Sequence, residues 1–240
     1  MNLRKVFVVF IALIAFISPV NVGSGVVNDS SSADVGVEWV TDYTYPYSDL
    51  PNSGTSANAF YNRLGAEGWT QKFNNGNSNA KAEHFESSGS DSTYIDGVDI
   101  AFYQGHCSTN KLDISAVLEK VYWYEAEWGD YDLEWIGLHA CEVLQEDYFA
   151  DALNGVHLIC GFSTSAYNYA EDGGAWADFL IDDGNDDAYP VLSSWFYGLD
   201  IKQPAGVQLK VFGENANCGN DFIWGQGPVI SDPPVDNIYS

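Results

Sequence analysis

Basic residues are scarce in this chain of 240 amino acids. Nine lysines and arginines stand against 34 aspartates and glutamates, so the formal net charge is −25 and the isoelectric point is about 4.1. A surface of this charge repels the phosphates of nucleic acids and of acidic lipids. We therefore exclude DNA and RNA as partners. The acidity itself is typical of a solvated surface.

Long hydrophobic runs are also few, and the first one lies at the N-terminus. Residues 6–17 are apolar, follow the basic segment MNLRK and precede small and polar residues. This is the layout of a secretory signal peptide, and the run is shorter than the roughly 20 residues that span a membrane. We predict a signal peptide over residues 1–24, a polar spacer over 25–34, and a secreted or extracellular protein without a membrane anchor after cleavage.

Cysteine is too sparse to form a disulfide scaffold. The four cysteines at 107, 141, 160 and 218 permit three pairings if all are bridged, and Cys160 lies in the apolar run VHLICGF, which predicts a core position. The sequence also lacks a Gly-x-Ser-x-Gly elbow, a phosphate-binding loop and a zinc-peptidase helix motif. These absences remove the support for other common hydrolase classes.

We expect no cofactor, with calcium as the one ion left open. The acidic turn IDDGNDDAY at residues 181–189 offers oxygen ligands of the kind that calcium prefers, but its spacing is not that of an EF-hand loop. The oligomeric state is open as well.

Strand-like and helix-like segments alternate along the rest of the chain, which predicts one α/β domain over residues 35–214 and a C-terminal extension over 215–240. Several strands are apolar on both faces, as in a mostly parallel sheet that is covered on both sides. The expected strands are 35–43, 70–74, 97–104, 132–140, 156–162 and 206–213, and the expected helices are 56–69, 79–88, 114–125, 142–153, 174–182 and 191–199.

Two reactive side chains follow consecutive strands of this predicted sheet. His106 comes after DIAFYQG, and Cys141 comes after EWIGLHA. Ligands of open α/β sheets bind at the carboxyl ends of the strands, and neighbouring strands lie roughly 5 Å apart. If the two strands are neighbours, an imidazole and a thiol meet at one edge. The imidazole, and the N-terminus of the helix expected after Cys141, would both favour the reactive thiolate, whereas Glu142 would oppose it.

At these residues the sequence resembles the superfamily of caspase, gingipain, legumain and clostripain cysteine peptidases. Its mark is a His-Gly after one hydrophobic strand and an Ala-Cys after the next, and QGHC and LHAC occupy those places. The chain resembles still more closely an uncharacterised prokaryotic family with a Gly-x-His-x-x-x-Gly-Phe segment, matched by GVHLICGF. The resemblance implies a three-layer caspase-like fold with a six-stranded sheet, His106 as acid and base, and Cys141 as nucleophile. It places Asp42 where some members have a residue that orients the histidine.

The chain departs from the peptidase pattern beside the histidine. The resemblance leads us to expect a glycine after His106, which would let the backbone approach the substrate closely, but Cys107 stands there and can crowd the oxyanion site. We count Gly105 and Cys107, on either side of the histidine, as supporting residues of the site. Cys107 and Cys141 at adjacent strand ends can also form a disulfide, which would cap the nucleophile.

Three further features have alternative interpretations. A metal site could be built from His106, Cys107, His139 and Cys141, because residues 139 and 141 share one side of a strand. We expect His84 on a surface helix and His157 in a structural role. The aromatic stretch VYWYEAEWGDYDLEW at 121–135 either packs a crossover against the sheet or forms a stacking platform for sugars or an extended partner.

The leading hypothesis is an exported cysteine peptidase or related thiol hydrolase that acts on a polypeptide substrate. The alternative is a non-catalytic secreted binding domain with a Cys107–Cys141 disulfide. Arg63 is the only arginine after the predicted signal peptide, so a pocket for acidic side chains has almost no guanidinium groups to use. We expect a preference for Lys, Arg or Asn over Asp before the cleaved bond.

Overall fold

The computed structural model describes residues 33–114, 119–184 and 186–232. The predicted signal peptide and all but the last two residues of the spacer lie outside the described residues. No helix in the described ranges is long and apolar enough to cross a membrane.

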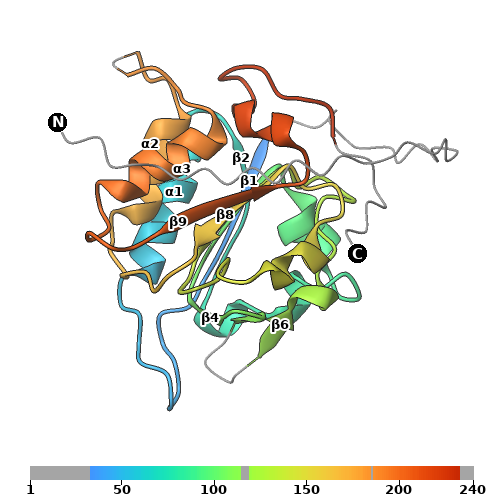
Figure 1. Cartoon of the computed structure of the whole chain (residues 1–240), viewed down its shortest axis with the longest axis vertical. Coiled ribbons are helices and arrows are strands. Elements are labelled where there is room, and N and C mark those ends of the chain that lie inside the picture. The colour runs from blue at the N-terminus through green and yellow to red at the C-terminus, as the bar shows by residue number, and fades with distance from the viewer. Residues whose placement is uncertain (1–32, 115–118, 185, 233–240) are drawn as a thin grey trace, which may run out of the picture.

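A six-stranded sheet with the order β2-β1-β3-β7-β8-β9 forms the middle of the molecule (Figure 1). The first five of these strands are parallel to one another, and β9 runs antiparallel to β8. The α/β class and the mostly parallel six-stranded sheet are thereby confirmed, and each strand matches one predicted segment. The strands are β1 (Asp34–Trp39), β2 (Thr70–Gly76), β3 (Ile100–Gln104), β7 (Trp135–His139), β8 (Leu158–Phe162) and β9 (Leu209–Gly213).

Three α-helices cover one face of the sheet: α1 (Ser53–Ala66), α2 (Asp172–Leu180) and α3 (Val191–Asp200) (Figure 1). Phe60 of α1 stacks on Trp176 of α2 with ring centroids 4.7 Å apart, and Trp195 of α3 meets Trp176 edge-on at 5.0 Å. All three aromatic side chains are buried against the sheet. These large rings fill the space between the helices and the sheet. The apolar face of each predicted helix therefore forms this core.

Within the ranges that the structure describes, the opposite face carries short 3-10 helices and a small antiparallel sheet instead of α-helices. Strands β4 (His106–Ser108), β5 (Lys111–Asp113) and β6 (Lys120–Tyr122) form that sheet, in the order β4-β5-β6. The 3-10 helices here are η1 (Asn77–Asn79), η2 (Ala82–His84), η3 (Asp91–Thr93), η4 (Ile95–Gly97), η5 (Trp123–Glu125) and η6 (Asp147–Ala152). The molecule therefore has three layers, with the sheet in the middle.

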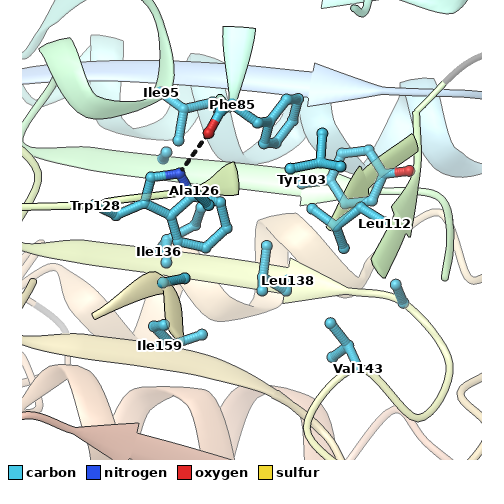
Figure 2. Packing of buried hydrophobic residues seen from close by; sticks show 14 of the residues in the cluster. Phe85, Ile95, Tyr103, Leu112, Ala126, Trp128, Ile136, Leu138, Val143 and Ile159 are labelled. Carbon is cyan, nitrogen blue, oxygen red and sulfur yellow. Dashed lines mark hydrogen bonds between the residues drawn. The ribbon is translucent and has the colours of Figure 1, made fainter. Parts of the chain in front are cut away.

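The helices predicted over 79–88, 114–125 and 142–153 were wrong in the residues that the structure describes. Val121 pairs with Leu112 in the small sheet, as suits a β-branched residue next to aromatic ones. Glu142 has a φ of 59°, which is incompatible with the start of an α-helix. On this face the structure is decided by contacts between segments distant in sequence and not by a helical repeat of apolar residues. Figure 2 shows Phe85, Trp128, Ile136, Leu138 and Val143 in one buried cluster. The Trp128 indole N–H donates to the Phe85 carbonyl at 3.0 Å.

The segment predicted as a C-terminal extension packs onto the helix-side core as far as residue 232. It contains η7 (Ala216–Asn220), and Cys218 and Ile223 are fully buried. His157 fastens it from the start of β8, with Nδ1 2.7 Å from Asp221 and Nε2 2.9 Å from Asp232. The structural role predicted for His157 is confirmed.

Several buried groups have pKa values above their ordinary range. Hydrogen bonds to Asp221 and Asp232 outweigh desolvation and raise the pKa of His157 to about 9. Desolvation raises the pKa of Glu38 to about 7, of Glu214 to about 7 and of Asp91 to about 6. At any pH between the unfolded and the folded pKa of such a group, the folded state holds a proton that the unfolded state has released.

We therefore expect stability to fall as the pH rises. The contribution of these groups is complete below their unfolded pKa values, about 4 for the carboxyls and 6.5 for histidine, and is lost as the pH passes their folded values. Thermal unfolding should show a Tm at pH 9 that is lower than at pH 5 by more than about 5 °C. Glu38→Gln should flatten this slope between pH 5 and 7. A Tm that is constant or rises with pH would contradict the prediction.

Candidate functional site

The carboxyl ends of β3 and β7 lie side by side, as the sequence predicted. Gln104 pairs with His139 in the parallel register, and the Gly105 amide donates to the His139 carbonyl at 3.3 Å. Two residues further along each segment, the Cys107 thiol donates to the Cys141 carbonyl at 2.7 Å. The peptide segments that carry His106 and Cys141 therefore converge at one edge of the sheet.

His106 is held by its backbone and by its ring. Its amide donates to the Tyr43 hydroxyl at 2.8 Å, and its ring stacks on Tyr47 with centroids 5.2 Å apart. Nε2 lies 2.8 Å from the Ser48 carbonyl. A carbonyl only accepts hydrogen bonds, so Nε2 carries the proton and Nδ1 of the neutral ring is left as the basic nitrogen.

The orienting role predicted for Asp42 is wrong. Asp42 is exposed, and its carboxylate accepts from the Asn77 side-chain amide at 3.0 Å. The Asn77 oxygen accepts in turn from the amides of Thr41 and Asp42. Asp42 thus closes the turn after β1, and the group on the His106 ring is the Ser48 carbonyl. The sequence contains no sign of this contact, because any residue offers a backbone carbonyl.

Gly105 allows two tyrosine hydroxyls to sit beneath the histidine. A Cβ on residue 105 would lie 2.1 Å from the Tyr103 hydroxyl and 2.6 Å from the Tyr43 hydroxyl. Both hydroxyls donate to the Asp113 carbonyl of β5, Tyr103 at 2.8 Å and Tyr43 at 3.0 Å. The glycine therefore permits the contacts that fix β4 and the His106 backbone.

Cys141 is partly exposed and faces the loop that follows β8. Its Sγ accepts from the Ala166 amide at 3.4 Å and lies 3.5 Å from the Ala166 carbonyl. A turn follows it, with Glu142 donating its amide to the Thr164 carbonyl. The predicted stabilisation of a thiolate by a helix N-terminus is thus wrong, and the Ala166 amide is the donor found on the sulfur.

The neighbouring Cys107 has a different character. Burial, followed by the proximity of Cys141 and Asp113, raises the pKa of the Cys107 thiol well above its usual range. It therefore stays protonated at neutral pH, as its hydrogen bond to the Cys141 carbonyl requires. Both thiols are free in the structure.

The alternative of a metal site built from His106, Cys107, His139 and Cys141 is not supported by the positions of these side chains. His139 is buried on the helix side, with Nε2 2.8 Å from Asp172 and its ring against Phe162. The His106 ring instead lies against Tyr43 and Tyr47. The alternation of side chains along a strand would place residues 139 and 141 on the same side. Strand β7 ends at His139, however, so this alternation does not extend to Cys141.

Elsewhere in the described residues, side chains of the types that bind metals gather in two clusters. In each cluster they already form ion pairs with other side chains of the protein. In the first, both nitrogens of His157 are occupied by carboxylates, beside Cys218. In the second, Asp34 joins Asp99 and Asp132 and pairs with Lys72 at 2.7 Å.

The prediction for His84 was wrong. The residue is buried in η2, with Nδ1 2.8 Å from Glu38 and its ring stacked on Tyr94 at 3.7 Å. It lies between Glu83 and Phe85 in a segment without a clear strand or helix repeat, so the sequence does not show that the side chain reaches the sheet.

A shallow hollow of about 700 Å³ lies at the same edge, beside the ends of β1 and β2 and the first half of α1. None of the nine described residues that line it is basic. They are Trp39, Thr41, Pro51, Gly54, Thr55, Asn58, Ala59, Asn62 and Asn77.

Comparison with known proteins agrees with this fold. The crystal structure of the Arg-specific cysteine proteinase gingipain R superposes with a TM-score of 0.53 and 14% sequence identity, over 75% of this chain and 46% of that chain. The present chain thus spans less than half of that protein, and the likeness identifies the caspase-like fold. No curated protein matches. Residues 37–239 match the family described as domain of unknown function DUF6345. Because that match covers most of the chain, the protein is a member of the DUF6345 family, built on the caspase-like fold.

Proposed function

We propose that the protein is a cysteine peptidase with Cys141 as nucleophile and His106 as general acid and base. The convergence of the two strand ends supports this most directly. The Ser48 carbonyl fixes Nε2 of His106 as a donor, so Nδ1 is available to receive a proton from a thiol. The caspase-like fold, shared with a cysteine proteinase, raises the expectation for this chemistry.

The reaction then follows from the two side chains. Cys141 Sγ attacks the substrate carbonyl and its proton passes to His106 Nδ1, which returns it to the leaving amine as the C–N bond breaks. Water hydrolyses the resulting thioester. The amides of Gly105, His106 and Glu142 already have acceptors. The candidate oxyanion donors are therefore the amides of Cys107 and Cys141.

We infer a preference for Lys, Arg or Asn before the cleaved bond. Arg63 lies at the far end of α1 from the site edge and pairs with Glu67 and Asp178. It is not positioned to bind an acidic side chain at the site. The hollow beside the edge is lined by asparagines and threonines and no basic residue. We propose that the substrates are polypeptides outside the cell, in line with the signal-peptide layout of residues 1–24.

Thiol labelling tests the assignment of the nucleophile. We expect iodoacetamide at pH 7 to modify Cys141 at least about tenfold faster than any other cysteine, because burial raises the pKa of each of the other thiols, that of Cys218 to about 12. Peptide mapping by mass spectrometry would give the four rates. Equal labelling of all four cysteines, or faster labelling of Cys107, would contradict the proposal.

A variant of His106 distinguishes activation of the Cys141 thiol by the imidazole from simple exposure of that thiol. His106→Ala should slow the labelling of Cys141 several-fold at pH 7 and remove the imidazole step from its pH profile. The control is His84→Ala, which removes an imidazole on the same face of the sheet without contact to Cys141. If His84→Ala slows labelling as much as His106→Ala, the effect is structural.

A non-catalytic binding domain is the second candidate, favoured by the contact between Cys107 and Cys141. The Cys107 sulfur lies 2.7 Å from the Cys141 carbonyl, so an oxidant such as glutathione disulfide could join the two thiols. Non-reducing peptide mapping of protein from an oxidising compartment distinguishes the cases. A permanent cross-link that resists mild reduction would favour the binding domain, and free thiols would favour the peptidase.

A further inference from the structure

A second hollow, with a volume of about 400 Å³, lies on the face that carries the small sheet. The aromatic groove, as we call it, is formed by the turn between β4 and β5, by β6 with η5, and by η6. Its lining residues are Thr109, Asn110, Tyr122, Trp123, Tyr124, Tyr148 and Asp151. The peptidase chemistry proposed above uses none of them.

The groove has a rigid base and exposed aromatic walls. Trp123 is 1% exposed and packs edge-on against Trp128, whereas Tyr124 is 67% and Tyr148 56% exposed. Tyr122 and Tyr124 stack with centroids 5.5 Å apart and planes at 20°. Two large aromatic side chains held this far into solvent, beside a fixed concave base, are typical of a preformed ligand site and not of core packing.

Polar groups suited to hydroxyl recognition stand beside the rings. Asp151 and Asn110 are exposed, and Asn110 accepts from Ser108 through its side-chain oxygen at 3.3 Å, so its amide nitrogen serves as a donor. A carboxylate, an amide and the Thr109 hydroxyl supply both acceptors and donors. Flat aromatic faces together with such groups complement a pyranose ring, which has an apolar face and a rim of hydroxyls.

The charge of the chain and a hydrogen bond within the groove argue against the other kinds of ligand that bind to aromatic side chains. Anionic ligands such as nucleotides and acidic polysaccharides are repelled by a chain of net charge −25 and by Asp151 at the groove. Proline-rich peptides dock on aromatic-lined grooves. In this groove the Trp123 indole N–H already donates to the Thr109 carbonyl at 3.0 Å and is not offered to a peptide carbonyl.

From this combination we propose that the aromatic groove binds an uncharged oligosaccharide, with the rings of Tyr124 and Tyr148 stacking on sugar faces and Asn110 and Asp151 bonding to hydroxyls. Titration calorimetry with cellohexaose, xylohexaose, mannohexaose and N-acetylchitohexaose tests this. At least one should bind with a Kd below about 1 mM.

Variants of the exposed tyrosines locate the site. Tyr124→Ala and Tyr148→Ala should each weaken binding about tenfold, whereas Tyr124→Phe, which keeps the ring, should retain most of it. Tyr197→Ala is the matched control, because Tyr197 is half exposed on α3 away from the groove. Circular dichroism verifies that each variant is folded.

The proposal is overturned if none of the four sugars binds up to about 10 mM. It is also overturned if Tyr197→Ala weakens binding as much as Tyr124→Ala, or if oligoproline displaces the bound sugar with higher affinity. Since the measurement is of binding and not of hydrolysis, it is independent of the peptidase proposal.

Discussion

Replacing Cys141 by alanine is expected to lower kcat/KM for peptide hydrolysis by at least about a thousandfold. In the mechanism that we propose, removing the Cys141 thiol removes the thioester pathway and leaves only what the surrounding groups do for direct attack by water. The substrates are a fluorogenic peptide library with each amino acid in turn before the cleaved bond. Wild type should cleave best after Lys, Arg or Asn, and Cys141→Ala should cleave none of them.

Cys107→Ala is the matched control for this loss. Its thiol stays protonated and contacts the Cys141 carbonyl, so its removal should leave at least about a third of the activity. If Cys141→Ala retains activity, or if activity is lost only in Cys107→Ala, Cys141 is not the nucleophile. Cleavage after Asp that depends on Cys141 would refute the specificity argued from Arg63.

Gly105→Ala is expected to cost about 2–4 kcal/mol of stability and to lower the reactivity of Cys141. The new Cβ would lie 2.1 Å from the Tyr103 hydroxyl, which cannot move away cheaply because its ring is fully buried. Relief of the clash must break its hydrogen bond to the Asp113 carbonyl and displace His106. Urea unfolding and iodoacetamide labelling measure the two effects.

Gly174→Ala provides the comparison. Residue 174 lies within α2, where the added Cβ would meet only the Ala59 methyl at 3.2 Å. This change should alter stability by less than about 1 kcal/mol, since alanine favours the helix. If Gly105→Ala is as mild as Gly174→Ala, the tyrosine hydroxyls do not hold the site as described.

The sequence was sufficient to predict the sheet but not both of its outer layers. Strands such as β3 and β8 are continuous apolar runs bounded by polar residues, which identifies them without tertiary information. The helix-side layer was also predictable, because Phe60, Trp176 and Trp195 are each followed four residues later by a buried leucine of the same helix. The other layer was not. Around Val121 and Glu142 the same residue types form β-bridges, turns and 3-10 helices, and contacts distant in sequence decide between them.

The candidate site was predictable only where a side chain itself carries the proposed chemistry. His106 and Cys141 could be found because they follow strands whose ends meet. Ser48 could not, because its contribution is a backbone carbonyl from an exposed loop. The buried pair of His84 and Glu38 was missed for a related reason: the residues next to His84 in the sequence do not show which strand its side chain reaches.

The most direct test of the central claim is a crystal structure of the protein after reaction with a peptidyl acyloxymethyl ketone that has lysine before the ketone. We predict a thioether between Cys141 Sγ and the inhibitor methylene, with His106 Nδ1 within about 4 Å of the modified sulfur or the inhibitor oxygen. An adduct on Cys107 would contradict the account, and so would a His106 Nδ1 more than about 8 Å from Cys141 Sγ with no inhibitor atom between them.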